Sequence, residues 1–245
     1  MLKNFIEMEF LKLKRSKMFL ISILGSLMVP VLLFFTAYKN KIDGNPVIFS
    51  EMLKYTNQYT LALFAIIVIA VLANYLFARE YQEHTLKSII PLPVSKTEFI
   101  VGKFVMYFIW VMVLSVITFI SANVLFYLVG ATGFTWTLFL KMFKQLIFGS
   151  VLLYLTMSPL VFISVWMKNS VATMIASATI VFGNMLVINS EYAPIYPWFA
   201  PYLISTGQLS QYNYGTLLPY LVVFATFLIG FFITLIYMYK KDIPL

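Results

Sequence analysis

Six apolar stretches, each about twenty residues long and free of Lys, Arg, Asp, Glu and His, dominate the sequence. They cover residues 18–37, 59–78, 104–129, 146–167, 171–189 and 217–239. A helix rises about 1.5 Å per residue, so about 20 apolar residues are needed to cross a hydrocarbon core of about 30 Å. A charge at the bilayer centre costs at least roughly 2.5 to 3.5 kcal/mol, so uncharged runs of this length indicate membrane crossings. We therefore expect an all-α integral membrane protein with six transmembrane helices, in a single transmembrane domain over residues 1–245.

Composition excludes a single water-soluble globule. Of the 245 residues, 62% are hydrophobic and only 11% are charged, whereas soluble domains are about half apolar and a quarter charged. The formal net charge of +8 could suggest nucleic-acid binding, but the 17 Lys and Arg residues lie in short clusters between the apolar runs. Because these clusters are dispersed, they do not form one basic surface for nucleic acid. We therefore expect them to contact lipid head groups, and we expect no nucleic-acid partner.

The chemistry available to the chain is narrow. It contains no cysteine and one histidine, His84, so thiolate chemistry and a metal site made of several histidines are excluded. Its one Gly-Lys pair, Gly102-Lys103, lacks the preceding glycine and the following Ser or Thr of a phosphate-binding loop. We therefore expect no enzymatic activity, no metal and no cofactor bound by this chain.

The basic residues between the apolar runs predict the orientation of the chain. One side holds twelve of them and the other holds five, and Lys and Arg favour the cytoplasmic side of a membrane. Both termini are therefore expected in the cytoplasm. The twelve are Lys3, Lys12, Lys14, Arg15, Lys17, Arg79, Lys87, Lys96, Lys103, Lys168, Lys240 and Lys241, and the five are Lys39, Lys41, Lys54, Lys141 and Lys144.

The segment before the first apolar run, residues 1–17, has the pattern of an amphipathic helix. Phe5, Ile6, Phe10 and Leu13 recur at helical spacing, with basic and polar residues around much of the remaining circumference. This pattern predicts a short helix in the membrane interface, with its basic end near anionic lipid. A topology anchor and a coupling role both remain open for it.

The connection between the second and third apolar runs, residues 79–102, carries the most charge in the chain. Helix can continue through Leu86, because the first breakers are Pro91 and Pro93. Ser95 and Glu98 then have the spacing of a capping box that starts a new helix. The sequence therefore predicts a helical hairpin with a sharp turn, where a soluble partner could dock.

Residues 77–103, FAREYQEHTLKSIIPLPVSKTEFIVGK, resemble the cytoplasmic loop of ABC-2 type permeases, the membrane subunits of one class of ATP-binding-cassette exporters. In that family an acidic helix end, usually Glu-x-Gly-Thr-Leu, precedes a proline-containing turn and a Gly-Lys pair that opens the third span. This sequence departs from the pattern at one point, since His84 stands where the family usually has glycine. The departure bears on local backbone geometry.

The resemblance implies a division of labour between subunits. The hairpin would couple the chain to a separate ATP-binding subunit, present twice per complex and carrying ATP and Mg. The N-terminal helix would act as an elbow at the same interface. A second copy of the chain, or a homologous permease, would complete the pathway in the cytoplasmic (inner) membrane. The expected coupling residues are Glu80, Glu83, His84, Thr85, Leu86, Pro93, Ser95 and Glu98, of which Glu80, Glu83 and Thr85 match motif positions of the family.

Between the fifth and sixth apolar runs lies a segment rich in proline and aromatic residues. Pro194, Pro197, Trp198 and Pro201 mark it, and Trp and Tyr favour the boundary between water and lipid. An interfacial anchor or a short re-entrant hairpin is the simpler interpretation. The Pro-Trp-x-x-Pro element also resembles a segment found in those family members that export bacteriocins, lantibiotics and other amphipathic peptides or confer immunity to them. A role of this segment in substrate binding is therefore kept as a hypothesis.

These observations favour an ATP-driven exporter of an amphipathic or antimicrobial peptide, for self-protection or secretion. Export of a lipid, glycan or drug is an alternative. An ion-coupled carrier is a second alternative, and such carriers usually have ionisable residues or broken helices at mid-membrane. The six apolar runs contain no charged residue, which counts against a carrier. A sodium site made only of carbonyls and hydroxyls would not be detected in this way. A membrane enzyme would need a paired base and nucleophile or a carboxylate cluster, and a scaffold role stays open.

Overall fold

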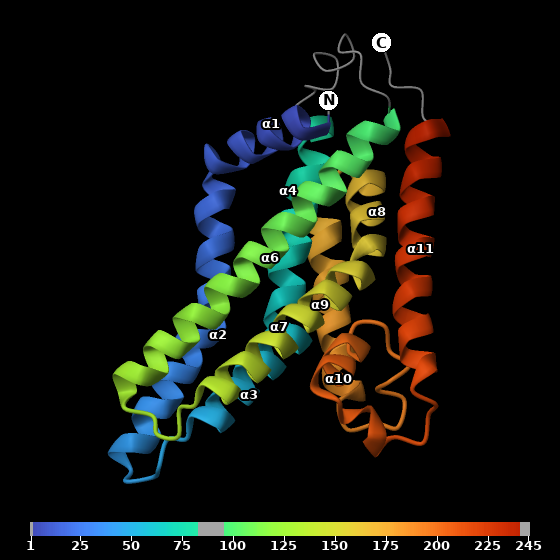
Figure 1. Cartoon of the computed structure of the whole chain (residues 1–245). Coiled ribbons are helices and arrows are strands. Elements are labelled where there is room, and N and C mark those ends of the chain that lie inside the picture. Colours follow the sequence, from blue (N-terminus) through green and yellow to red (C-terminus); the bar gives the residue numbers. More distant parts are fainter. Residues whose placement is uncertain (1, 83–95, 241–245) are drawn as a thin grey trace.

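The computed structural model describes residues 2–82 and 96–240, and this part of the chain is helical, with a single isolated β-bridge between Ile48 and Thr132 (Figure 1). The elements follow in the order α1 (Leu2–Lys14), α2 (Lys17–Ile42), α3 (Phe49–Tyr59), the π-helix η1 (Thr60–Phe64), α4 (Ala65–Gln82), α6 (Lys96–Val129), α7 (Trp136–Thr156), α8 (Ser158–Met167), α9 (Ser170–Val187), α10 (Ala200–Thr206), the 3-10 helix η2 (Gln208–Gln211) and α11 (Leu217–Lys240).

Six helices in the described part of the chain are long and apolar enough to cross a membrane. They cover residues 17–42, 49–79, 97–129, 136–156, 170–187 and 217–240, which confirms the predicted all-α fold with six spans. Figure 1 shows α1 and the last turn of α11 at one end of the bundle, which we call the α1 end. The opposite end, where α10 lies, is called the α10 end.

The fourth crossing differs from the prediction of one run over residues 146–167. Helix α7 begins at Trp136, where the Thr135 hydroxyl accepts a hydrogen bond from the Leu138 amide at 3.2 Å and caps the helix. Met157 interrupts the helix, and α8 then carries the chain on to the α1 end (Figure 1). The interruption follows from Pro159, which lacks an N–H and therefore fits the first turn of a new helix better than the interior of a long one.

The connection expected over residues 38–58 is mostly helical. Helix α2 extends to Ile42, and α3, η1 and α4 follow one another without a gap from Phe49. Helix α3 is polar on one side, but Phe49, Met52 and Leu53 are buried on the other. An amphipathic helix of this kind averages to low hydropathy, so a search for apolar runs starts the second span too late.

The helices pack through small and polar contacts as well as apolar ones. The Trp110 indole donates to Ser22 Oγ at 3.1 Å, and Thr118 Oγ1 donates to the Ser26 carbonyl at 2.9 Å, which joins α6 to α2. At the other side of the bundle, α8 and α11 approach closely at Gly230. Small residues and hydrogen bonds of this kind hold helices together in lipid, where apolar burial gives no advantage over lipid contact.

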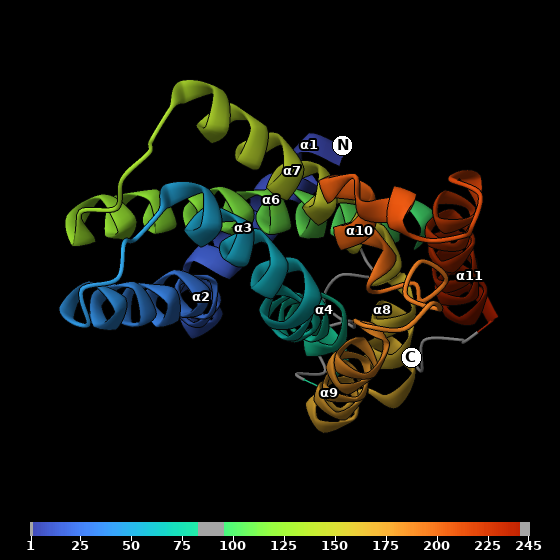
Figure 2. The same cartoon turned by 90° about the horizontal axis from the view of Figure 1, so that it is seen from below.

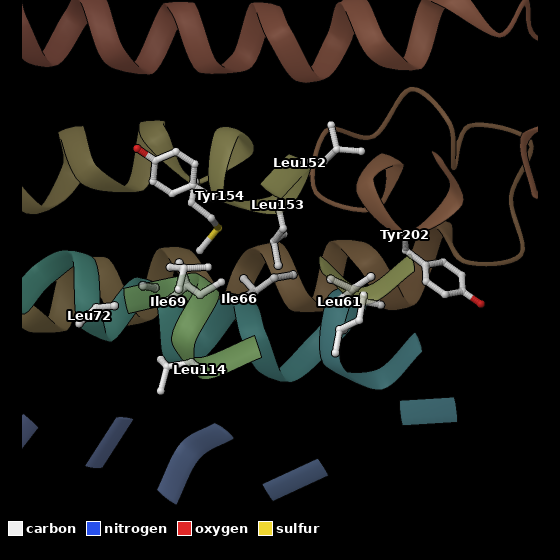
Figure 3. Close-up of a cluster of buried hydrophobic side chains, with 14 of the residues drawn as sticks. Leu61, Ile66, Ile69, Leu72, Leu114, Leu152, Leu153, Tyr154 and Tyr202 are labelled. Atoms are coloured by element: carbon white, nitrogen blue, oxygen red, sulfur yellow. The ribbon is translucent and has the colours of Figure 1, made fainter. Parts of the chain in front are cut away.

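The central element is the helix formed by η1 and α4. It contributes Leu61, Ile66, Ile69 and Leu72 to a buried cluster that also receives side chains from α6, α7 and α10 (Figure 3). Helices α2 and α11 lie at opposite edges of the bundle (Figure 2). Many of their large apolar side chains are exposed on the isolated chain, as suits a surface that faces lipid.

Substitution of Gly230 tests the contact between α8 and α11. A Cβ atom there would lie 2.5 Å from the Pro159 nitrogen and from the Ser158 carbonyl carbon. These are backbone atoms that cannot move alone, so Gly230→Ala should lower the free energy of unfolding by about 1–3 kcal/mol. The measurement is unfolding of the detergent-solubilised protein followed by tryptophan fluorescence. The control is Ala225→Leu, at an exposed position of α11; equal stability of the two variants would contradict the packing described.

Candidate functional site

Three helices meet at the α1 end: α1, the end of α4 and the beginning of α6. Helix α1 lies across this end of the bundle, as Figure 1 shows, so the predicted N-terminal helix is present. Leu13 is fully buried, and the ring of Phe10 packs edge-on against Trp110 of α6 with 6.4 Å between centroids. Phe5 and Ile6 lie in α1, but their side chains are outside the described part.

A buried ion pair joins α1 to α6. Glu9 of α1 and Lys103 of α6 are only 3% and 2% exposed, and 3.6 Å separate Glu9 Oε2 from Lys103 Nζ. The other carboxylate oxygen of Glu9 accepts from Lys12 Nζ at 2.7 Å. The Lys103 ammonium also donates to the Leu76 carbonyl of α4 and lies 5.0 Å from the centre of the Phe99 ring. One lysine therefore binds α1 and α4 to α6, and a buried charge is stable only with partners of this kind.

A second set of contacts joins α1 to α4 directly. The Tyr75 hydroxyl donates to the Lys12 carbonyl at 3.3 Å. Arg79 donates to the same hydroxyl, and its guanidinium lies 5.0 Å from the centre of the Tyr75 ring. Farther along, Thr97 Oγ1 and the Tyr239 hydroxyl are 2.5 Å apart, which links the beginning of α6 to the end of α11. We call the contacts of Glu9, Lys12, Tyr75, Arg79 and Lys103 the elbow junction.

The elbow junction holds together the two helices that flank residues 83–95 in the chain. Helix α4 ends at Gln82 and α6 begins at Lys96, both at the α1 end (Figure 1). The ends of both helices are thus joined to α1 by side-chain contacts.

At the α10 end, residues 190–212 fold back against the bundle, and we call them the outer plug. Helix α10 is buried from Ala200 to Ser205 and packs against α7. Pro194 and Pro201 are buried, whereas Pro197 and Trp198 are half-buried. Burial raises the pKa of Tyr202 above its ordinary value, and its hydroxyl oxygen accepts a hydrogen bond from Gln208 Nε2 at 3.4 Å.

Trp198 connects the outer plug to the interruption between α7 and α8. Its indole N–H donates to the Thr156 carbonyl at 2.9 Å. In a continuous helix this carbonyl would accept from Leu160, but the Leu160 amide donates to Met157 instead. Trp198 therefore supplies the hydrogen bond that the interruption removes. Its own carbonyl accepts from Asn184 of α9 at 3.4 Å, so the plug also joins α9 to this point.

Comparison with known proteins agrees with this architecture. A family model described as ABC-2 family transporter protein matches residues 5–185, well over half of the chain. This chain belongs to the ABC-2 transporter family. It is also 35% identical, over 208 residues, to the bacitracin transport permease protein BCRB of Bacillus licheniformis; the match covers 84% of this chain and 99% of that protein.

The protein is thus an ABC-2 permease, a multi-pass membrane subunit of an ABC transporter. Within residues 2–82 and 96–240 of the permease, no group of three or more His, Asp or Glu side chains could hold a metal ion. Members of the family act with separate ATP-binding-cassette subunits, as the resemblance of residues 77–103 implies.

Only two of the predicted coupling residues, Glu80 and Glu98, lie within the described part of the permease. Glu98 is exposed in the first turn of α6, and Glu80 lies in α4, although its side chain is not described. The other predicted positions lie outside the described residues, and the proposed capping box with them, since it includes Ser95. They are Glu83, His84, Thr85, Leu86, Pro93 and Ser95.

The ion pair between Glu9 and Lys103 was not predicted from the sequence. One signal for it exists: Glu9 lies one helical turn before Leu13, on the face of α1 that is otherwise apolar. A carboxylate in that position needs a partner when the face is buried. The identity of the partner depends on the tertiary fold, because α1 and α6 are far apart in the sequence.

A double-mutant cycle tests the ion pair. Lys103→Met leaves the buried carboxylate of Glu9 without one of its two positively charged partners, so the free energy of unfolding should fall by about 3 kcal/mol. The double variant with Glu9→Gln has no buried carboxylate and should recover much of the loss. Unfolding in detergent provides the measurement, with Lys17→Met at an exposed position as the control. The single variant Glu9→Gln completes the cycle, and additive losses in the two single variants and the double variant would show that the two charges do not interact.

A second substitution tests the hydrogen bond of Trp198. Trp198→Phe leaves the buried Thr156 carbonyl without its donor, which should cost about 1–3 kcal/mol of stability. Trp166→Phe is the matched control, because Trp166 is 54% exposed and lies near the end of α8. Hydrogen exchange in the residues around Met157 should rise in the first variant only; equal exchange would argue against the role given to Trp198.

Proposed function

We propose that the permease forms, together with a second permease subunit, the membrane pathway of an ATP-driven exporter of an amphipathic peptide. The observation that carries the proposal is the 35% sequence identity to a protein named as a bacitracin transport permease, over 99% of that protein's length. The described crossings are mostly aliphatic and aromatic, a lining that suits a peptide with apolar side chains better than a small ion. Export would protect the producing cell or secrete the peptide.

Two ATP-binding subunits, carrying ATP and Mg, would dock on residues 80–98. The elbow junction supports this location, because it ties α6 to α1 through Lys103 and α4 to α1 through Tyr75. A push on the hairpin would therefore move α1, α4 and α6 together. In this mechanism Glu80, Glu83 and Thr85 contact the ATPase.

The permease would lie in the cytoplasmic membrane with its α1 end inside. Twelve of the seventeen basic residues belong to the expected cytoplasmic side, and five, Lys54 among them, to the opposite side. Helix α1 would rest in the inner interface with its basic residues toward anionic lipid. Lipid, glycan and drug export remain the alternatives within the same family, and the choice of substrate in the experiment below separates them.

The proposal predicts a loss of coupling when the motif is altered. The double variant Glu83→Ala, Thr85→Ala, expressed with the ATPase subunit, should export bacitracin roughly tenfold more slowly while ATP hydrolysis persists, because the hairpin no longer transmits the stroke. Export and phosphate release are measured in proteoliposomes.

The matched control alters the same residue types at the other end of the molecule. Glu51→Ala with Thr137→Ala changes exposed side chains of α3 and α7 near the α10 end, and it should export normally. Normal export by the hairpin variant would refute the assignment of the coupling residues. A phospholipid or an unrelated drug exported in place of bacitracin would refute the peptide substrate.

A further inference from the structure

A cavity of about 570 Å³ opens at the α10 end between α3, the end of α9 and the outer plug. Its wall is mostly polar and includes Lys54, Gln58, Glu191, Gln208, Gln211 and Tyr212. We call this cavity the outer vestibule. Its volume falls within the range of about 300–1,000 Å³ that is typical of ligand pockets.

The outer vestibule carries one charge of each sign. Lys54 comes from α3 and Glu191 from the turn after α9. Both are exposed, and in the described part of the chain neither forms an ion pair with the other or with a third residue. Between them stand amide side chains that can both donate and accept hydrogen bonds. The vestibule therefore offers partners to an ammonium, a carboxylate and peptide groups.

A smaller, apolar pocket of about 140 Å³ continues from the vestibule along η1 and α9. The two spaces share Gln58, Ile188 and Phe199, so they adjoin. Ala62 and Leu63 of the π-helix η1 line the small pocket from one side, and α9 lines it from the other. We call this space the inner pocket. π-Helical turns are rare and often occur at functional sites.

One buried polar atom in the wall of the inner pocket has no partner. Asn184 is 1% exposed, and its amide nitrogen donates to the Ala62 carbonyl at 2.6 Å. Its carbonyl oxygen Oδ1 forms no hydrogen bond within the described residues. An unsatisfied buried acceptor costs about 1–3 kcal/mol. This oxygen is itself covered by its neighbours, so it marks a weak point in the packing behind the wall of the inner pocket.

The size of the inner pocket selects the kind of occupant. An apolar protein cavity of about 150 Å³ binds one benzene molecule, so 140 Å³ accommodates one aromatic or branched aliphatic side chain. A peptide fits both spaces, because it carries bulky apolar side chains next to backbone N–H groups and charged ends.

We propose that the outer vestibule and inner pocket form a binding site within a single permease subunit for an amphipathic peptide. The peptide inserts one bulky apolar side chain beside Asn184 and places its polar and charged groups between Lys54 and Glu191. The inference rests on the proposed function for the class of substrate. It adds a location and a mode of recognition, with specificity set by the inserted side chain.

Protection of a single cysteine tests occupancy of the site. The chain has no cysteine, so Asn189→Cys places one reactive thiol in the wall of the vestibule, and Thr137→Cys places another on the exposed start of α7 as the control. Labelling by a membrane-impermeant maleimide is followed with bacitracin or diheptanoyl phosphatidylcholine present. The peptide should slow labelling of Cys at 189 about tenfold and leave the control unchanged. Protection by the lipid alone, or no protection by either, would overturn the inference.

A pair of tryptophan substitutions tests the inner pocket. Ile188→Trp fills the passage shared by the two cavities, whereas Leu186→Trp adds the same ring at a position that is 83% exposed. The first should abolish protection and export of bacitracin, and the second should retain both. Co-purification with the ATPase subunit verifies that each variant folds. Protection that survives Ile188→Trp would refute the inner pocket as the anchor.

The two proposals fail in different ways. If the wild-type permease exports no peptide, the proposed function is wrong, yet labelling protection by the peptide would still establish the binding site. If the wild type exports bacitracin and Ile188→Trp exports it equally well, the exporter assignment stands and the site is wrong. Direct binding and export are thus read separately from the same set of proteins.

Discussion

The structure depends on one constraint: within a bilayer, every backbone N–H and C=O group must find a partner inside the protein. Helices satisfy this requirement along their length, which is why the described chain is almost entirely helical. The interruption at Met157 breaks the pattern and frees the Thr156 carbonyl, and the indole of Trp198 restores the missing hydrogen bond at 2.9 Å. A local defect in α7 and α8 therefore fixes the position of the outer plug. The plug in turn forms one wall of the outer vestibule, so this hydrogen bond helps to hold that wall in place.

A different constraint operates at the α1 end. A buried charge is costly without partners, and Lys103 finds Glu9 on one side and the Leu76 carbonyl on the other. The pair fixes α1 against the two helices that lead into and out of residues 83–95. Because a buried ion pair adds little net stability compared with well-packed apolar residues, its value lies in fixing which surfaces meet. The elbow is thereby held in one position relative to the ends of α4 and α6.

The sequence predicts the fold class well because a membrane crossing depends on the summed hydropathy of about twenty residues, and six segments have a high sum. The sequence predicts less well those features that depend on one side of a helix or on contacts between distant helices. Helix α3 carries Lys54 and Gln58 on one side and buries Phe49 and Leu53 on the other, so its average hydropathy hides it. The motif around Glu80 led to the correct family, and Trp198 lies in a segment singled out for its composition, whereas the coupling and substrate roles of these segments stay predictions. The partners of Glu9 and Trp198 depend on helices that are distant in sequence, and a single sequence does not bring those helices together.

The two ends of the molecule share one element. Helices α3, η1 and α4 follow each other without a gap from Phe49 to Gln82, so the same continuous rod carries Lys54 in the vestibule, Ala62 beside Asn184, and Leu76 and Arg79 in the elbow junction. In the proposed mechanism, a tilt of this rod driven at the α1 end would change the width of both cavities at the α10 end. Coupling between distant sites requires an element whose position both sites influence, and the proposed mechanism assigns this role to the rod from Phe49 to Gln82. The π-helical turn lies at the point where the rod lines the inner pocket, so the irregular part of the rod is also the part that faces the bound peptide in the proposed mechanism.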